Sequence, residues 1–418
     1  MNTKPAIGAI LALATWGGAA PAQTALTMWN HGSGNAVESR ILNQIISDFN
    51  ASQKDWSVSL QRYPQLVYND SVVTAASAGT LPDILDVDGP MMPNWAWSGY
   101  LQPLQMDDSK VAGFLPAAKG IYDSKLYSIG LWDVALALIT RKSTLDDLKL
   151  REPTLDMPWT AQEFEGALKA AKASGKFRFA LDLGTAWKGE WYPYAFSPFL
   201  QSFGGDLIDR TSYASATGAL NGDAAMAWGK WWQDLFAAGY AQAAQDPADR
   251  DSGFIGGQYA FSWAGNWAAA NALMAFPDAL FLPAPDFGKG SRIGAASWQF
   301  AVSAKSAHPD GASKFIEFAL QDKYLAEFAN GIGVIPATTA AAAMTQDFKP
   351  GGPMAVFYDL AKVQGLLRPV TPGYGVEAKV FEKAASDIAN GADVSATLNA
   401  AVDEIDADIA KNKGYAAR

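Results

Sequence analysis

After an apolar leader, the spacing of hydrophobic and polar positions alternates between the period of a strand and the period of a helix. This spacing predicts strands and helices in turn. An apolar run from Ala25 predicts a first strand. A helix is expected next, because Asn35 can cap it and apolar side chains then recur every fourth position, at Val37, Ile41, Ile45 and Phe49.

The same strand and helix grammar continues through the next forty residues. Alternation from Val58 predicts a second strand, and Gly79 ends a second helical pattern before a third strand, "DILDV". The helical period of that pattern is carried by Tyr68, Val72, Val73 and Ala76. Strand, helix, strand, helix, strand predicts a parallel sheet covered by helices, and such sheets bind ligands beyond the carboxyl ends of their strands.

A second domain is expected after a long extended segment through Trp132 and Asp133. Its helices begin with a capping box at Thr160 and Glu163, and further helical patterns stop at Gly204 and Gly239. The stretch "ASWQFAVSAKSAHPDGASKFIEFAL" has the strand-then-helix grammar of the first domain, so we expect the chain to cross back there. A last amphipathic helix carries Leu398, Val402, Ile405 and Ile409 on one side.

Composition narrows the possible functions. The 418 residues are 49% hydrophobic and 18% charged, and the formal net charge is −10, which disfavours binding to nucleic acid or to an anionic membrane surface. The chain has no cysteine and two histidines, so disulfides, thiolate metal sites and poly-histidine metal sites are excluded. No cofactor or catalytic motif is found, and neither a metal nor a cofactor is expected.

Residues 1–22 have the pattern of an export signal. Lys4 precedes an apolar run, and Ala20-Pro21-Ala22 suits cleavage before Gln23. The run is shorter than the roughly 20 residues that span a bilayer, which disfavours the alternative of a membrane anchor. We therefore predict a periplasmic protein that is not embedded in the membrane.

Nine phrases in order carry a resemblance to a known family. They are "LTMWNH", "AGTLPDILDVD", "LQPLQ", "KLYSIGLWDVALALITRKSTL", "PWTAQEFEGALKAAK", "GGDLID", "GGQYAFSWAGNWA", "WQFAVSAKSAHPDGASKFIEF" and "NGIGVIPA". The chain resembles the family 1 extracellular solute-binding proteins, the maltose-binding-protein-like sugar receptors of bacterial ABC importers. The family usually has Pro where this chain has Asn266, a departure that adds a side-chain amide.

The resemblance implies an α/β fold of two lobes, each a mainly parallel sheet flanked by helices, joined by a hinge of several crossings. The expected N-terminal lobe comprises 23–133 and 292–341, and the C-terminal lobe 134–291 and 342–418. It also implies a monomer that binds a carbohydrate between the lobes and delivers it to the permease subunits of the importer.

The residue types at the predicted cleft suit a sugar. The C–H faces of a pyranose pack on aromatic rings, and its hydroxyls pair with carboxylates, amides and guanidinium groups. We expect the binding residues at strand ends and loops to be Asn30, His31, Arg62, Asp86, Asp88, Trp132, Asp133, Gly184, Trp187, Trp191, Trp263, Gly265, Asn266, Trp267, Trp298, Gln299 and Arg368.

Several of these positions have a structural alternative. Trp263 and Trp267 could staple a helix to its domain instead of stacking on a sugar, with Gly265 letting the backbone approach the ligand. Asp86 or Asp88 could cap a helix, and Arg368 could form a salt bridge between the lobes instead of clamping hydroxyls. Trp228, Trp231 and Trp232 have helical spacing and are expected in the core.

Two other classes of function compete with a sugar receptor. A receptor of the same fold could take a polyol, a peptide, or an acidic or sulfonated sugar, since Arg62 and Arg368 could pair with an anion. A secreted glycoside-active enzyme also uses carboxylates beside aromatic rings. We expect no enzyme, because the candidate aspartates have no neighbouring glutamate to complete an acid and base pair.

Overall fold

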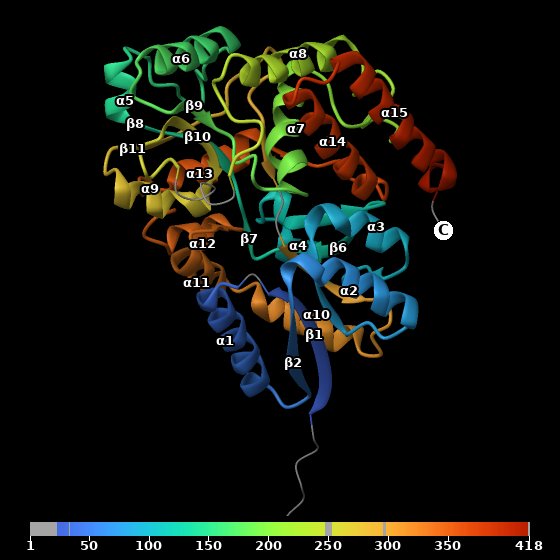
Figure 1. Cartoon of the computed structure of the whole chain (residues 1–418). Helices are drawn as coiled ribbons and strands as arrows, with labels where there is room; N and C mark the ends of the chain where they lie inside the picture. The colour runs from blue at the N-terminus through green and yellow to red at the C-terminus, as the bar shows by residue number, and fades with distance from the viewer. Residues whose placement is uncertain (1–22, 33, 247–252, 296–297, 417–418) are drawn as a thin grey trace, which may run out of the picture.

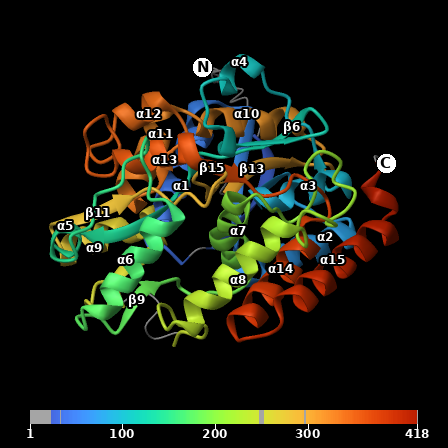
Figure 2. The same ribbon diagram turned by 90° about the horizontal axis from the view of Figure 1, so that it is seen from above.

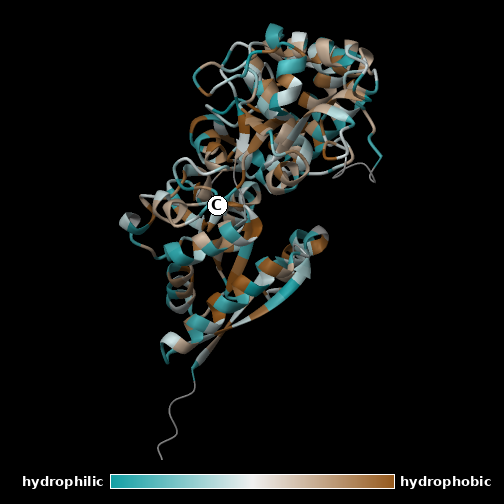
Figure 3. Ribbon diagram, turned by 90° about the vertical axis from the view of Figure 1, so that its left-hand side faces the viewer, coloured by the Kyte–Doolittle hydropathy of each residue, from teal (hydrophilic) through white to brown (hydrophobic). Residues whose placement is uncertain are grey.

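The chain folds into two bodies, each built on its own β-sheet (Figures 1 and 3). The computed structural model describes residues 23–32, 34–246, 253–295 and 298–416. The predicted export signal, 1–22, lies outside the described residues. The α/β class expected from the sequence is confirmed.

The first body begins with the predicted strand and helix order. It comprises β1 (Thr24–Gly32), α1 (Ala36–Ser52), β2 (Trp56–Pro64), α2 (Gln65–Ala78) and β3 (Ile84–Asp88). Both β2 and β3 pair with β1 in parallel. The carboxyl ends of β1 and β3 therefore lie at the same edge of the sheet.

Local signals fix the ends of both helices. The Asn35 side chain accepts hydrogen bonds from the backbone N–H groups of Val37 and Glu38, as the cap prediction required. Gly79 takes a left-handed conformation (φ 70°) at the end of α2, which glycine adopts without steric cost. Helix α2 buries Tyr68, Val72 and Ala75, whereas Val73 lies on its outer side and is 43% exposed.

The first sheet is mixed and not mainly parallel. Its order is β2-β1-β3-β13-β6-β5, and β13 (Trp298–Ser303) runs antiparallel to both β3 and β6 (Lys125–Ile129). Strand β5 (Lys119–Tyr122) forms an antiparallel hairpin with β6, and the short β4 (Leu101–Gln102) pairs with β13. The expected return of the chain to the first domain is confirmed, and β13 enters the sheet in the opposite direction to β3.

The second sheet is also mixed. Its order is β11-β8-β10-β9, and only β10 (Tyr259–Gly265) and β9 (Phe179–Asp182) are parallel. Strand β8 (Leu136–Arg141) is antiparallel to both β10 and β11 (Ala279–Leu282). The expectation of mainly parallel sheets was wrong because β8 and β13 arrive directly from the other body, so no crossover helix sets their direction.

Two short ladders lie where the chain passes between the sheets. Strand β7 (Trp132–Asp133) lies between β6 and β8 in the chain and pairs with β14 (Ile335–Pro336). Strand β12 (Ile293–Ala295) lies between β11 and β13 and pairs with β15 (Gly365–Leu367). The chain thus crosses several times, and the exact lobe limits stay a prediction.

Helices cover both sheets. The first body also contains α3 (Met92–Trp97), α4 (Asp108–Val111), α10 (Pro309–Ala319) and α11 (Asp322–Ile332), with α10 and α11 packed on α1. Further helices are α5 (Lys142–Asp147), α6 (Ala161–Ala173), α7 (Trp191–Phe203), α8 (Asp223–Ala237), α9 (Ala269–Ala275), α12 (Thr339–Ala343), α13 (Ala355–Gln364), α14 (Tyr374–Ala389) and α15 (Val394–Lys411).

Packing of the second body follows the predicted patterns. The capping box of Thr160 and Glu163 starts α6 as expected. Helices α7, α8, α14 and α15 lie together in both Figure 1 and Figure 2. Helix α14 contacts the other three, and α8 contacts α7 and α15. Trp228 and Trp232 on α8 are fully buried in this group, which confirms them as core. Among the described residues, no helix combines the length and apolarity needed to cross a bilayer.

Glu377, in the first turns of α14, is a buried carboxyl group. It is 1% exposed, and neither carboxyl oxygen has a hydrogen-bond partner among the described residues. Burial, helped by the charges of nearby Asp206 and Asp408 and opposed by Arg210, raises the pKa of Glu377 to about 8. The neutral acid is therefore the form that the fold accommodates.

Glu377→Gln should remove a pH dependence of stability. The folded protein keeps the Glu377 proton between its unfolded pKa near 4.5 and its folded pKa near 8, so stability falls as pH rises through that window. At pH 9 the free energy of unfolding of the variant should exceed that of wild type by on the order of 3 kcal/mol. Urea denaturation at pH 5 and pH 9 measures this difference.

The exposed Glu404 on α15 offers a matched control. Glu404→Gln makes the same chemical change in solvent and should leave the pH profile of wild type unchanged. Equal pH slopes for Glu377→Gln and wild type would contradict the assignment of a neutral Glu377.

Candidate functional site

The carboxyl ends of β1 and β3 carry a buried polar cluster. Asn30 donates from Nδ2 to Asp86 Oδ2 at 2.5 Å, and His31 Nδ1 lies 2.5 Å from the same oxygen. The Trp298 ring from β13 stacks on the His31 imidazole, with centroids 3.7 Å apart and planes within 8°. The structure thus brings four predicted site residues together from three neighbouring strands.

The surroundings of this imidazole favour its protonated form. Burial by itself lowers the pKa of His31, but the charge and hydrogen bond of Asp86 outweigh it, helped by Glu38 and Asp88, and the pKa is raised above 6.5. The second oxygen of Asp86, Oδ1, is buried and has no hydrogen-bond partner among the described residues.

Arg368 lies at the centre of a second cluster, which connects the starts of α7 and α14 to the ladder of β12 and β15. Its Nε is 2.8 Å from Glu190 Oε1, its Nη1 donates to the carbonyl of Ala295 at 3.0 Å, and its guanidinium lies over the Tyr194 ring at 4.9 Å. Tyr374 donates its hydroxyl to Glu190 Oε1 at 2.5 Å.

Electrostatics link this cluster to the end of β3. Burial raises the pKa of Asp88, while Arg368 and His31 oppose that shift. Burial, opposed by Arg368 and helped by Asp88, raises the pKa of Glu190 to about 7. Asp88 and Arg368 therefore interact through their charges. Arg368 forms a salt bridge with Glu190, but both residues fall within the expected C-terminal lobe, so this pair is not the interlobe salt bridge that the sequence left open.

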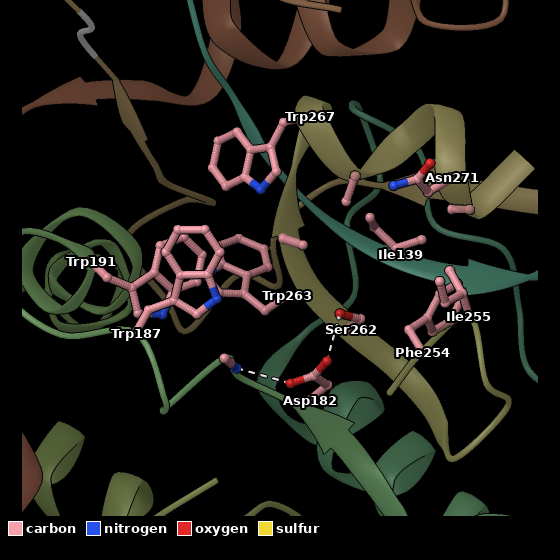
Figure 4. Close-up of a pocket in the computed structure, with 14 residues that line it drawn as sticks. Ile139, Asp182, Trp187, Trp191, Phe254, Ile255, Ser262, Trp263, Trp267 and Asn271 are labelled. Carbon is pink, nitrogen blue, oxygen red and sulfur yellow. Dashed lines mark hydrogen bonds between the residues drawn. The ribbon is translucent and has the colours of Figure 1, made fainter. Parts of the chain in front are cut away.

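An open cavity of about 160 Å³ lies against the second sheet (Figure 4). Trp187, Trp191 and Trp267 present their rings to it, and Figure 4 shows these rings gathered on one side, with Asp182, Ser262 and Asn271 on the other. Trp191 meets Trp267 edge to face at 6.2 Å. The lining residues also include Ile139, Gly184, Phe254, Ile255, Trp263, Ala264, Ala268 and Ala272.

Gly184 is required by the backbone beneath these rings. Its φ is 62°, and a Cβ there would lie 3.4 Å from Trp191 and 3.5 Å from Trp187. The Gly184 N–H donates to Asp182 Oδ1 at 2.9 Å, which closes the turn at the end of β9. Gly184, which was predicted as a site residue, thus forms the turn that positions Trp187 and Trp191.

Three predictions around the turn after β10 need correction. Trp263 is 1% exposed, its Nε1 donates to Ala195, and its ring packs on Phe199, so the stapling alternative is the observed arrangement. The space over Gly265 is filled by the Trp267 ring, 2.1 Å from where a Cβ would lie, and so is closed to a ligand.

Both ends of the Asn266 side-chain amide form hydrogen bonds within the protein. Its Oδ1 accepts from the Ala135 N–H at 2.9 Å, and its Nδ2 donates to the Gly333 carbonyl at 2.6 Å. It is 1% exposed. The amide that was expected to read a sugar hydroxyl instead ties the end of β10 to two segments near the β7 and β14 ladder.

Other predicted residues lie in or near the crossings. Trp132 packs on Phe328 at 4.5 Å, and Asp133 is buried and influences Tyr194 through its charge. Gln299 accepts from Ser128 and donates to Ala117, which uses both ends of its amide.

Arg62 lies away from these groups. Its Nη2 donates to Ser39 O and Asn43 Oδ1 on α1, because α1 packs beside β2. The expectation that Arg62 faces the same site as Arg368 is therefore not met by its contacts.

Several residues of these clusters were not predicted from the sequence as site residues. Asp182 ends a strand before Gly184, a signal comparable to that used for Asp86. Glu190, Tyr194 and Tyr374 lie at the starts of α7 and α14, and only their place next to Arg368 distinguishes them from ordinary helix residues. No group of three or more His, Asp or Glu side chains arranged for a metal occurs within the described part of the chain.

Comparison with known proteins identifies relatives of similar organisation. The family description "Bacterial extracellular solute-binding protein" matches residues 44–353. An uncharacterized lipoprotein of Streptomyces antibioticus is 25% identical over 71% of this chain and 67% of its own length. The maltodextrin-binding protein MdxE of Bacillus subtilis is 23% identical over 68% of this chain and 66% of its own length, so the chain spans about two thirds of each of these curated relatives.

Solved structures share the fold. The cyclic alpha-maltosyl-1,6-maltose binding protein of Arthrobacter globiformis superposes with a TM-score of 0.76 at 21% identity. The superposition covers 92% of this chain and 98% of that chain. The two-lobe arrangement seen in Figure 3 is therefore a known architecture.

Asp86→Asn should lower the pKa of His31. The substitution removes the carboxylate charge that outweighs burial, so less of the imidazole is protonated at neutral pH. NMR titration measures this directly, because the chain has only two histidines and a His308→Gln variant assigns the remaining signal. The exposed Asp70→Asn is the charge-matched control, and equal shifts in both variants would refute the role of Asp86.

Proposed function

The chain belongs to the bacterial extracellular solute-binding proteins, and from this membership and the site geometry we propose that it captures a sugar between its two bodies for an ABC importer. The observation that carries the proposal is the gathering of Trp187, Trp191 and Trp267 around one open cavity. Three indole faces from two segments offer stacking surfaces for pyranose rings.

Polar groups near these rings suit hydroxyls. Asn271 and Ser262 line the same cavity, and Tyr194 lies between the Trp267 ring at 6.4 Å and the Arg368 guanidinium at 4.9 Å. Tyr194 and Arg368 are each 6% exposed, so the open cavity of the tryptophans is the surface available to the sugar.

The relatives indicate which sugars to test first. The Bacillus relative is a maltodextrin-binding protein, and the Arthrobacter structure is that of a cyclic maltosyl-maltose binding protein. We propose glucose-based oligosaccharides as the first ligand class. Acidic sugars are disfavoured, because Glu190 already pairs with Arg368 and Asp86 and Asp88 lie nearby.

Binding without chemistry is the proposed role. The carboxylates of the site are engaged with His31, Asn30 and Arg368, and the proposal assigns none of them to bond cleavage. The ligand would gain its full set of contacts only when the bodies close on it, which shifts the population toward the closed state. The permease subunits of an importer would then receive the closed form.

Trp267→Ala should weaken binding of maltotriose by roughly tenfold to a hundredfold, since about 1.5–3 kcal/mol accompanies burial of a large apolar side chain. Isothermal titration calorimetry measures the change. Trp97→Ala removes a half-buried indole on α3, away from the cavity, and should leave the affinity within about twofold of wild type. Binding of maltotriose that is insensitive to Trp267→Ala would remove this ring from the site.

Saturating sugar should contract the protein in solution. Each body carries part of the contacts, so the ligand favours the more compact arrangement. Small-angle X-ray scattering of wild type with and without ligand should show a smaller radius of gyration in the presence of the sugar that binds best by calorimetry. An unchanged radius at saturation would contradict the closure mechanism while leaving binding itself intact.

A further inference from the structure

Helix α2 leaves an open groove beside the face of β1 and β2 that it covers. The groove consists of two adjoining hollows of about 440 and 260 Å³, which share Trp29 and Thr80 as lining residues. No residue that lines it also lines the tryptophan cavity, and none is among the residues expected to bind the sugar in the cleft. The groove is therefore a surface to which the proposed sugar capture assigns no role.

The groove lies on the face of the sheet away from α1. Arg62 on β2 donates to two groups on α1, whereas the next residue, Tyr63, lines the groove, as the alternation of side chains along a strand requires. The fully buried ring of Tyr68 contacts both Tyr63 and Trp298 of the buried polar cluster, with centroids 6.3 and 5.8 Å away. This ring therefore lies between the groove and the polar cluster.

Two aromatic rings form part of the groove wall. Trp29 and Tyr63 are both half-buried, and their ring centroids lie 4.6 Å apart with the planes inclined at 51°. Gln61 donates from Nε2 to the Tyr63 hydroxyl at 2.9 Å, which leaves the phenolic proton able to donate to a ligand. Partly exposed indole and phenol rings are surfaces on which the C–H faces of a pyranose pack.

The polar side chains around these rings are nearly all uncharged. Among the described lining residues Asp70 is the only charged one, and the others with hydroxyl or amide groups are Thr27, Ser59, Gln61, Ser71, Thr74 and Thr80. Ser71 and Thr74 donate to backbone carbonyls one turn earlier on α2, so their oxygens keep lone pairs for the hydroxyls of a ligand. The wall therefore suits a neutral ligand with many hydroxyl groups.

An extended peptide is a poorer match, because the outer edge of β2 is blocked at two places. The Asn50 side chain donates to the Val58 carbonyl at 3.0 Å and accepts from the Val58 N–H at 2.8 Å. The Gln53 side chain pairs in the same way with Trp56, at 2.6 and 2.8 Å. These side chains occupy the backbone groups that an added strand would need.

We propose that the α2 groove binds a neutral oligosaccharide, with its ring faces against Trp29 and Tyr63 and its hydroxyls paired with the polar side chains of β2 and α2. An acidic sugar would be repelled by Asp70, and a purely apolar ligand would cover the hydroxyl groups of the wall without pairing them. The groove is a second sugar-binding surface on the first body, and it does not depend on the sugar capture proposed above.

Native electrophoresis through soluble amylopectin, and through a soluble mixed-linkage β-glucan in a second gel, tests the groove. Wild type should be retarded by at least one polymer relative to a polymer-free gel. Thr74→Arg places a long side chain in the groove and should weaken this binding about tenfold, and Trp29→Ala should weaken it by removing a stacking ring. Ser77→Arg is the matched control, because Ser77 is exposed on α2 outside the groove and also donates to a carbonyl one turn earlier.

The outcomes separate this groove from the tryptophan cavity. Retardation that is lost in Thr74→Arg and in Trp29→Ala, with circular dichroism showing folded variants, but kept in Ser77→Arg and Trp267→Ala would establish the groove as a sugar site. That result would hold whether or not the tryptophan cavity binds sugar. Failure of wild type to bind maltotriose in calorimetry would count against the sugar capture alone.

Three results would overturn the groove as a sugar site. The first is equal retardation of wild type and Thr74→Arg, or no retardation by either polymer. The second is loss of retardation in Trp267→Ala with retention in Thr74→Arg, which would assign the polymer to the tryptophan cavity. The third is a concentration-dependent dimer in sedimentation that Thr74→Arg dissociates, which would assign the groove to a second copy of the chain.

Discussion

The burial of one guanidinium group organises the region where the two bodies meet. Arg368 interacts with three other segments: with Glu190 and Tyr194 at the start of α7, with the Ala295 carbonyl in β12 and with the charge of Asp88 in β3. A buried charge is tolerated only when its partners are in place, and removal of one partner of such a pair typically costs about 3–5 kcal/mol. The tyrosines and acids at the starts of α7 and α14 are thus positioned by the need to satisfy this charge, and the tryptophan cavity lies directly beyond them.

Periodic patterns predicted most elements because each depends on local physics. The caps at Asn35 and Thr160, the left-handed Gly79 and the buried face of α15 were all found where spacing and residue type required them. Strand direction was harder to predict. The direction of β8 and β13 depends on the body from which the chain arrives, and no local sequence pattern indicates this.

The candidate site was predicted in part. Asn30, His31, Asp86 and Trp298 meet as expected because neighbouring strand ends converge at one sheet edge. The turn after β10 was misread, since a tryptophan at a helix entrance has the same local pattern whether it faces a cleft or the core. Trp263 could be placed only by its partners Ala195 and Phe199, which lie more than sixty residues away in the chain.

The place of β13 in the first sheet has a consequence for biosynthesis. This strand lies between β3 and β6, pairing Trp298 with Asp88 and Phe300 with Ile129, although it is made long after both neighbours. A nascent chain that has emerged only as far as α9 therefore has two unpaired strand edges in its first body and lacks the middle of that sheet. Such non-local pairing slows folding, so the first body to be synthesised cannot be completed until most of the second has left the ribosome.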